Sequence, residues 1–220
     1  VSKIYFYLGE FDDALTFALG AESLFDVNQR SEYVETVVSK AIDQYVVQRN
    51  TPESPPLSPR FTSIIDKMIA RCIESEEYHQ VLGIALESRR LDVIEQVFKT
   101  TQDKALLSYV LEMVIRVLNV PEVRRQVLQL LVQLFQSLDE PDYFSTAQCY
   151  VYLNEPQPVS EMLRSLVRCA AKDEHAALVA YQTAFDLVEG ATQEFLHHVR
   201  ADIEKVSEDA VSKQVMSILS

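Results

Sequence analysis

Apolar residues recur at steps of three and four along nearly the whole chain. Residues 34–45 show the pattern, because Val34, Val37, Val38 and Ala41 fall on one side of a helix. The same spacing recurs in later segments, namely residues 61–72, 78–86, 91–98, 113–118, 127–138, 144–151, 159–166, 178–188 and 195–206. No segment alternates with the period of a β-strand. We therefore expect an all-α protein of about a dozen helices.

The composition agrees with a helical chain. Only 4 glycines occur among 220 residues, far below the ~7% of average usage, which disfavours turn-dense β architecture and glycine-rich phosphate loops. An apolar content of 48% is sufficient for a continuous hydrophobic core.

The segment LGEFDDALTFALGA at residues 8–21 suggests how the helices are joined. Gly9 is expected to close one helix in the left-handed conformation, and acidic residues then favour the start of the next. Small residues on the buried side would let two helices approach closely. The expected buried positions are Phe11, Ala14, Leu15, Ala18 and Ala21.

An acidic turn followed by an aromatic residue occurs three times. The aromatic residues are Phe11, Tyr78 and Phe144, which lie 67 and 66 residues apart. Each interval equals two helical hairpins of about 33 residues, near the period of tetratricopeptide-type arrays. The repeat predicts one domain over residues 1–220, an α-solenoid or rod of stacked antiparallel hairpins.

Prolines and a serine mark expected element boundaries. Residues 50–60, NTPESPPLSPR, hold four of the eight prolines and predict an exposed loop between two helices. Ser54 and Ser58 each precede a proline, so this loop is either a phosphorylation site or a loop without a specific role. Ser31 is expected to cap a helix, and Pro141 and Pro156 to lie in first turns.

The charge of the chain restricts its partners. With 20 basic and 33 acidic residues, the formal net charge is −13, which repels nucleic-acid phosphates and anionic lipid surfaces. No apolar run approaches the ~18 residues of a membrane span. We therefore expect binding neither to nucleic acid nor to a membrane.

The three cysteines carry no metal or disulfide signature. Cys72, Cys149 and Cys169 have no CxxC spacing and lie within helical apolar patterns, so we interpret them as reduced core thiols. This favours the cytoplasm and nucleus. The first residue is Val1 rather than Met, and we expect the chain to be part of a longer protein.

The sequence contains no motif for catalysis, a metal or a cofactor. His197 and His198 are adjacent and point about 100° apart on a helix, unlike a zinc-binding His-x-x-x-His pair; His79 and His175 lie elsewhere. Nucleophile-elbow, dinucleotide and Walker motifs are absent. We expect no catalytic, cofactor-binding or metal-binding residues and no small-molecule substrate. The alternative is a helical enzyme whose residues meet only in three dimensions.

The segment LGIALESRRLDVIEQV at residues 82–97 has two interpretations. Gly83 and Ala85 are expected to allow a tight helix crossing, and Asp92 to favour the start of a helix. Arg89 and Arg90 either reach the carboxylates of a partner, or they cap local helix carbonyls or lie in solvent.

Several segments resemble one known family in collinear order over residues 1–199. They are YLGEFDDALTFALGAESLFDVNQRSEYVETVVSKAID at 7–43, GIALESRRLDV at 83–93, DEPDYFSTAQCYVYLNEPQPVSEML at 139–163 and AYQTAFDLVEG at 180–190. They are similar to the N-terminal helical region of the largest non-ATPase subunits of the proteasome 19S regulatory particle, which are proteasome/cyclosome-repeat proteins. The loop at 50–60 and the residues after about 201 match less well.

The resemblance implies a helical rod that precedes a toroid of repeats, in a non-catalytic scaffold that helps to join the ATPase base to the lid. It implies regulatory-particle subunits as partners, and it transfers no individual binding residue. The alternative from periodicity alone is a helical-repeat adaptor of another intracellular complex, which would bind a short peptide in a concave groove.

Overall fold

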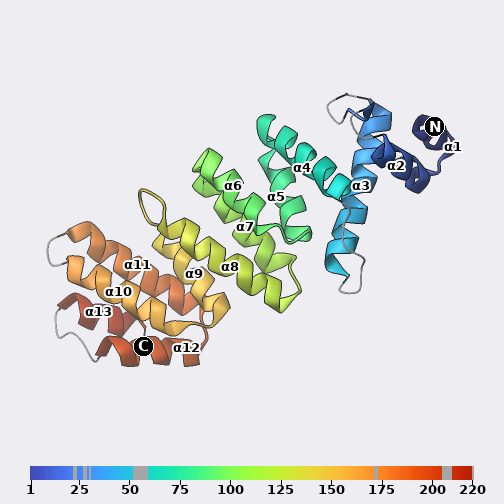
Figure 1. The fold of residues 1–220 in the computed structure, drawn as a ribbon. Coiled ribbons are helices and arrows are strands. Elements are labelled where there is room, and N and C mark those ends of the chain that lie inside the picture. The colour runs from blue at the N-terminus through green and yellow to red at the C-terminus, as the bar shows by residue number, and fades with distance from the viewer. Residues whose placement is uncertain are drawn as a thin grey trace. The chain divides into compact units, whose positions relative to one another are not determined.

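The computed structural model describes residues 1–21, 24–26, 29, 31–51, 59–170, 173–204 and 210–219. This part of the chain contains thirteen α-helices and no β-strand, which confirms the all-α prediction (Figure 1). The helices are α1 (Ser2–Leu8), α2 (Phe11–Gly20), α3 (Glu32–Asn50), α4 (Pro59–Glu74), α5 (Tyr78–Glu87), α6 (Leu91–Thr101), α7 (Lys104–Arg116), α8 (Pro121–Gln136), α9 (Tyr143–Leu153), α10 (Pro156–Ala170), α11 (Glu174–Gly190), α12 (Gln193–Glu204) and α13 (Ala210–Ile218).

The helices form two compact units. The first is Val1–Thr101, with α1 to α6, and the second is Gln102–Ser220, with α7 to α13. The expectation of one domain over residues 1–220 stays a prediction.

In the first unit each helix packs on its neighbour in the chain, and two of the helices also pack on the next helix but one. α2 contacts α3 and α4, and α3 contacts α4 and α5. The stripe predicted on α3 is buried, with Val34, Val37, Ala41 and Tyr45 each at most 2% exposed. The stripe on α4, from Phe61 to Cys72, is buried as well. Periodic apolar positions thus become the contacts between stacked helices.

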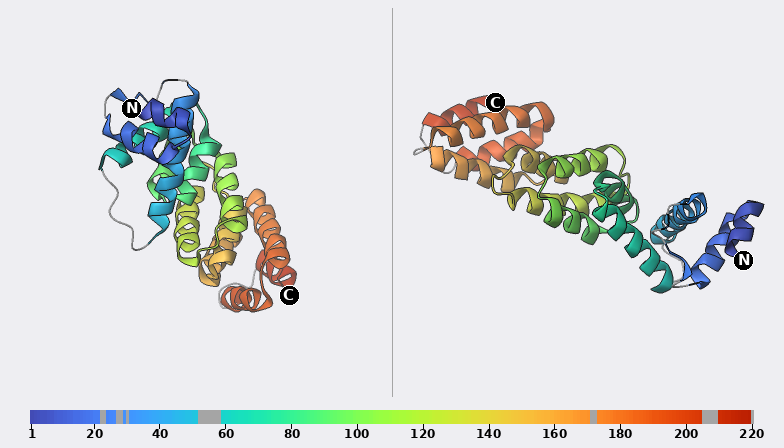
Figure 2. Two further views of the ribbon diagram at one scale, coloured as in Figure 1. Left: turned by 90° about the vertical axis from the view of Figure 1, so that its right-hand side faces the viewer. Right: turned by 90° about the horizontal axis from the view of Figure 1, so that it is seen from above.

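The second unit is built from hairpins arranged in two layers. α8 packs on α9 and α10 packs on α11, while α9 contacts α11 and α10 contacts α12. We call α7, α9 and α11 the odd layer, and α8, α10 and α12 the even layer. Both views in Figure 2 show the last helices of this unit, in orange and red, lying next to one another.

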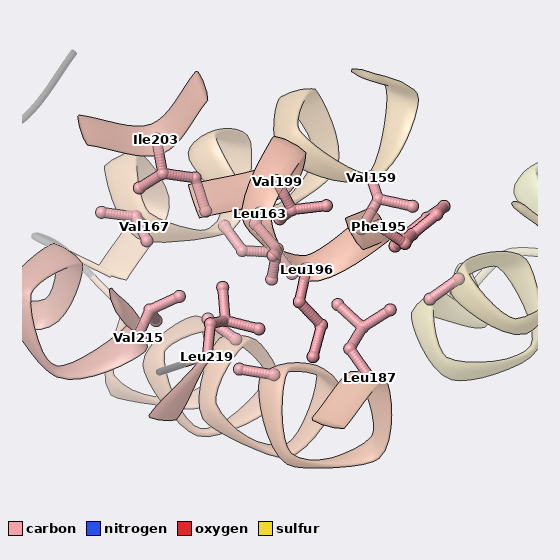
Figure 3. Close-up of a cluster of buried hydrophobic side chains, with 14 residues drawn as sticks. Val159, Leu163, Val167, Leu187, Phe195, Leu196, Val199, Ile203, Val215 and Leu219 are labelled. Carbon is pink, nitrogen blue, oxygen red and sulfur yellow. The ribbon is translucent and has the colours of Figure 1, made fainter. Parts of the chain in front are cut away.

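The core of the second unit joins α10, α11, α12 and α13. Figure 3 shows Leu163 of α10, Leu187 of α11 and Leu196 of α12 directed toward one another, with Val215 of α13 and Leu219, just after that helix, closing the cluster. All five side chains are at most 2% exposed. Each helix alone would leave this surface in water, so packing supplies most of its stability.

Four connections share one C-terminal capping geometry. Gly9, Glu76, Arg89 and Asn154 have φ of 81°, 59°, 57° and 57°, which is the left-handed region. Each N–H bonds the carbonyl three residues earlier, and the following N–H bonds the carbonyl five residues before it. These are Schellman turns, and the next helix begins after a single further residue. The prediction for Gly9 is confirmed.

Helix starts were predicted at Ser31, Pro141 and Pro156, and two of these three predictions are confirmed. The Ser31 hydroxyl accepts a hydrogen bond from the Val34 N–H at 3.3 Å, and Pro156 is the first residue of α10. The prediction for Pro141 is wrong, because α9 begins at Tyr143 and its N-cap is Asp142. An acidic cap replaces the expected first-turn proline.

Several residues expected in the core lie on the surface instead. Phe11 is 40% exposed, Val117 52% and Phe144 49%. Val117 follows the last residue of α7, where the helical direction no longer holds it against the core. Phe11 and Phe144 occupy first turns, where fewer neighbours cover a side chain.

The apolar stripe expected at residues 178–188 is also wrong. Leu178, Phe185 and Val188 are exposed, because α11 packs through the adjacent face that carries Ala180, Ala184 and Leu187.

The predicted two-hairpin repeat holds for only one of its intervals. From Tyr78 to Phe144 the chain runs from α5 to α9, which is four helix steps. From Phe11 to Tyr78 it runs only from α2 to α5, because the 19 residues of α3 and the connection to α4 occupy the length of another helix. The equal spacing of Phe11, Tyr78 and Phe144 therefore does not mark equivalent positions.

Most of the predicted proline-rich loop, including Ser54 and Ser58, lies outside the described residues. Pro59 is the first residue of α4, so the helix begins inside the expected 50–60 loop.

Gly83 does not serve the tight helix crossing expected from the sequence. A Cβ atom added to Gly83 would meet no atom within 4 Å, whereas Ala85 on the same helix is fully buried. Of these two small residues, only Ala85 lies where another helix could approach α5 closely.

We expect Gly83→Ala to raise the free energy of unfolding by about 0.5–1 kcal/mol, because alanine restricts the unfolded chain and meets no clash in α5. Urea unfolding of residues 1–220 measures this. Gly9→Ala is the opposite control and should be destabilising, because φ is 81° there. A loss of stability in Gly83→Ala would contradict the conclusion that a Cβ atom at position 83 meets no neighbouring atom.

The N-cap of α9 is a buried ionic contact. Asp142 is 7% exposed, and its carboxylate accepts hydrogen bonds from the Ser145 hydroxyl at 2.7 Å and Lys104 Nζ at 2.9 Å. Burial alone would raise the pKa of Asp142, but the bonds from Lys104 and Ser145 outweigh it and hold this pKa below its ordinary value. The ionised carboxylate therefore stabilises the start of α9.

We expect Asp142→Asn to lower the free energy of unfolding by about 1 kcal/mol at pH 7. The native pKa lies below the unfolded value of about 3.9, so the contribution is present above that pH and is lost as the pH falls through the native pKa. Urea unfolding at several pH values should show the deficit shrinking below pH 4. The exposed Asp139→Asn serves as control, and a deficit independent of pH would contradict this explanation.

Candidate interaction surface

The four histidines do not converge. His79 lies in the first turn of α5 and His175 in that of α11, and both are exposed. His197 and His198 are neighbours on α12 with ring centroids 6.3 Å apart, and His198 Nδ1 lies 2.8 Å from the Glu194 carbonyl oxygen of its own helix. Within the described ranges, no three His, Cys, Asp or Glu side chains gather in a way that could hold a metal ion.

The cysteines are free thiols, but only two are core residues. Cys72 and Cys149 are buried, and burial raises the pKa of both, to about 12 for Cys149. Cys169 is exposed, so its prediction as a core thiol is wrong. It lies in the last turn of α10, beyond Leu166 and Val167, which are the last buried residues of that helix.

No described helix combines the length and the hydropathy that crossing a lipid bilayer requires.

Arg90 is held within the first unit rather than presented to solvent. Its guanidinium donates to both carboxylate oxygens of Asp92 at 2.7–3.0 Å, to Asp66 Oδ1 at 2.9 Å and to the Tyr45 hydroxyl at 3.2 Å. These partners belong to α6, α4 and α3, and the Arg90 side chain is only 17% exposed. Neither role expected for Arg90 is correct, because its side chain joins three helices of the first unit.

Hydrogen bonding sets the ionisation of this junction. The bond to Asp92 raises the pKa of Arg90 and lowers the pKa of Asp92, so both groups are charged in the folded state. Nearby, Arg49 Nε donates to the Ser88 carbonyl at 3.1 Å and Asn50 Nδ2 to the Glu87 carbonyl at 2.9 Å. The end of α3 thus satisfies carbonyls that α5 leaves open at its own end.

Two adjoining depressions lie on the odd layer of the second unit. One, of about 250 Å³, lies between α9 and α11, and the other, of about 280 Å³, between α7 and α9. They share Phe144, Gln148 and Tyr152 of α9, and we call the combined surface the aromatic groove. Phe144 is 49% and Tyr152 47% exposed.

The two layers present different faces to solvent. α9 contains no charged residue at all, and its outward positions are Phe144, Gln148 and Tyr152. The even layer is polar, because the exposed residues of α8 include Glu122, Arg125 and four glutamines. A helix that faces water on one side ordinarily carries charge there, so α9 lacks the outward face of a solvent-exposed helix. Sequence reasoning missed this groove, although the absence of charge in residues 143–153 is a visible signal.

The Arg90 junction yields a stability prediction. We expect Arg90→Ala to lower the free energy of unfolding of the first unit by about 1–3 kcal/mol, because it removes charge-assisted hydrogen bonds and leaves their acceptors unpaired. Lys99→Ala, which breaks an exposed pair with Glu95, should change it by less than about 0.5 kcal/mol. Urea unfolding measures the free energy of unfolding of both variants. Equal losses in Arg90→Ala and Lys99→Ala would contradict a stabilising role of the Arg90 junction.

Comparison with known proteins places the chain in a family. The family model described as "26S proteasome subunit RPN2, N-terminal domain" matches residues 1–220. The 26S proteasome non-ATPase regulatory subunit 1 homolog B of Arabidopsis thaliana is 43% identical over 204 residues, and non-ATPase regulatory subunit 1 of Drosophila melanogaster is 42% identical over 204 residues. The regulatory subunit rpn2 of Schizosaccharomyces pombe is 38% identical over 203 residues.

Each of these alignments covers 90% of this chain but only 20–21% of the relative. The chain thus spans about a fifth of the length of the curated relatives it matches. With the family model matched over all 220 residues, the chain belongs to the family of 26S proteasome subunit RPN2 N-terminal domains.

Proposed function

We propose that this chain is a non-catalytic scaffold segment of the 26S proteasome regulatory particle, which supports assembly of the lid with the base and so serves ubiquitin-dependent protein degradation. The observation that carries the proposal is the family match over residues 1–220 to proteins named as non-ATPase regulatory subunits of the proteasome. Other regulatory-particle subunits are the partners we propose. The match favours this function over an adaptor of another complex.

The architecture supports a scaffold. Successive helices bury one face against their neighbours and present the other outward, so a short chain gains a large surface for other proteins. Polar clusters such as the Arg90 junction are occupied within the fold and stiffen the connections between helices. We include in the proposal that this segment performs no reaction of its own.

The proposed compartments are the cytoplasm and the nucleus. Three free cysteines, one of them exposed, are compatible with a reducing environment.

We expect the full-length protein that contains this chain to co-sediment with lid and base subunits of the proteasome. A tagged version expressed in cells would be separated on a glycerol gradient at low salt, and each fraction probed for lid, base and peptidase-core subunits. The control is the same tag on an unrelated helical-repeat protein. Migration of the full-length protein without regulatory-particle subunits would contradict the proposed function.

A further inference from the structure

We propose that the aromatic groove docks a basic amphipathic helix from a partner protein, with apolar side chains over Phe144 and Tyr152 and with lysines or arginines facing the carboxylates at its border. The inference deepens the proposed function and rests on it, because it gives the chemistry of one partner of the scaffold.

The centre of the groove is apolar. Phe144 and Tyr152 each leave close to half of their surface in water, and Ala147, Val151 and Leu187 line the depression between α9 and α11. Tyrosine and phenylalanine are enriched in the centres of protein interfaces, where they supply large contact area at little cost in side-chain entropy. The polar even layer of the same unit shows no comparable surface among its described residues.

The border of the groove carries net negative charge. The two depressions are lined by three carboxylates, Glu112, Asp186 and Glu189, but by one basic residue, Arg116. Arg116 Nη1 already lies 2.9 Å from Glu112 Oε1, so it compensates that carboxylate. Asp186 and Glu189 belong to α11, which contains no lysine or arginine. A partner with positive charge therefore complements this side of the groove, and an acidic partner would be repelled.

The shape of the groove suits a helical partner. The two depressions, of about 250 and 280 Å³, each admit an anchoring side chain. The described residues of α7 to α11 offer no strand edge to which an extended peptide could add. A helix satisfies its own backbone and binds through side chains alone, and anchors at i and i+4 or i+7 can reach both sides of α9.

The test places a photoreactive residue in the groove of the full-length protein inside its assembled complex. Phe144 is replaced by p-benzoylphenylalanine, the purified complex is irradiated, and mass spectrometry identifies the cross-linked segment. The control position is Gln133, an exposed residue of α8 in the even layer. We expect position 144, and not position 133, to capture one segment with apolar residues at helical spacing and with a net positive charge.

The captured segment is then synthesised as a peptide, and its Kd for the full-length protein is measured by fluorescence anisotropy. We expect Phe144→Ala to weaken binding at least about ten-fold and Glu189→Lys about three- to ten-fold, the latter most strongly at low salt. Leu178→Ala and Glu161→Lys are matched controls, because both residues are exposed but line neither depression, and they should leave the Kd unchanged.

The possible results distinguish a failure of the groove proposal from a failure of the scaffold proposal. Capture of an acidic or uncharged segment, of a second copy of this chain, of another part of the same chain or of no segment would overturn the groove proposal. It would leave the scaffold proposal intact if the protein still co-sediments with proteasome subunits. A protein that never joins those subunits, but whose groove captures a basic helix, would refute the scaffold and leave the groove standing.

Discussion

Burial of an apolar helix face against neighbouring helices of the same unit is the constraint on which this structure depends. A helix of 10 to 19 residues with a continuous apolar stripe is at best marginally stable alone in water, because nucleation and side-chain ordering cost more than its own hydrogen bonds return. Stacking removes the stripe from water and holds the helix at the same time. In this chain Val37, Val81, Leu163 and Val199 are all fully buried in such contacts.

Tight connections make the stacking regular. Left-handed residues at Gly9, Glu76, Arg89 and Asn154 end their helices so sharply that the next helix starts two residues later. Three of the four carry a Cβ atom, which costs of order 1–2 kcal/mol in this conformation. The cost is offset by satisfied helix-end carbonyls and by neighbouring bonds such as those made by Arg49 and Asn50.

The sequence predicted the helices because apolar residues at steps of three and four are typical of a helix that buries one face. The stripes of α3 and α4 are buried as expected, and Ser31 caps α3. Periodicity could not show that Phe144 lies half in water. The apolar pattern is the same whether or not a neighbouring helix covers the residue. The role of Arg90 could not be predicted either, because its partners Tyr45 and Asp66 lie 45 and 24 residues away in the sequence. The connections at Glu76 and Arg89 gave no signal, because neither residue type favours the left-handed region.

The unequal faces of the second unit link fold to function. Stacking explains why the helices from α2 to α13 each bury residues on one side, whereas it leaves the uncharged outward side of α9 in contact with water. Alkylation rates test this directly in the full-length protein, free and in its assembled complex. A cysteine introduced by Gln148→Cys reports the aromatic groove, and native Cys169 on α10 serves as an internal reference. The account predicts that the cysteine at position 148 reacts quickly in the free protein and at least about ten-fold more slowly after assembly. An equal rate at position 148 in both states would contradict it.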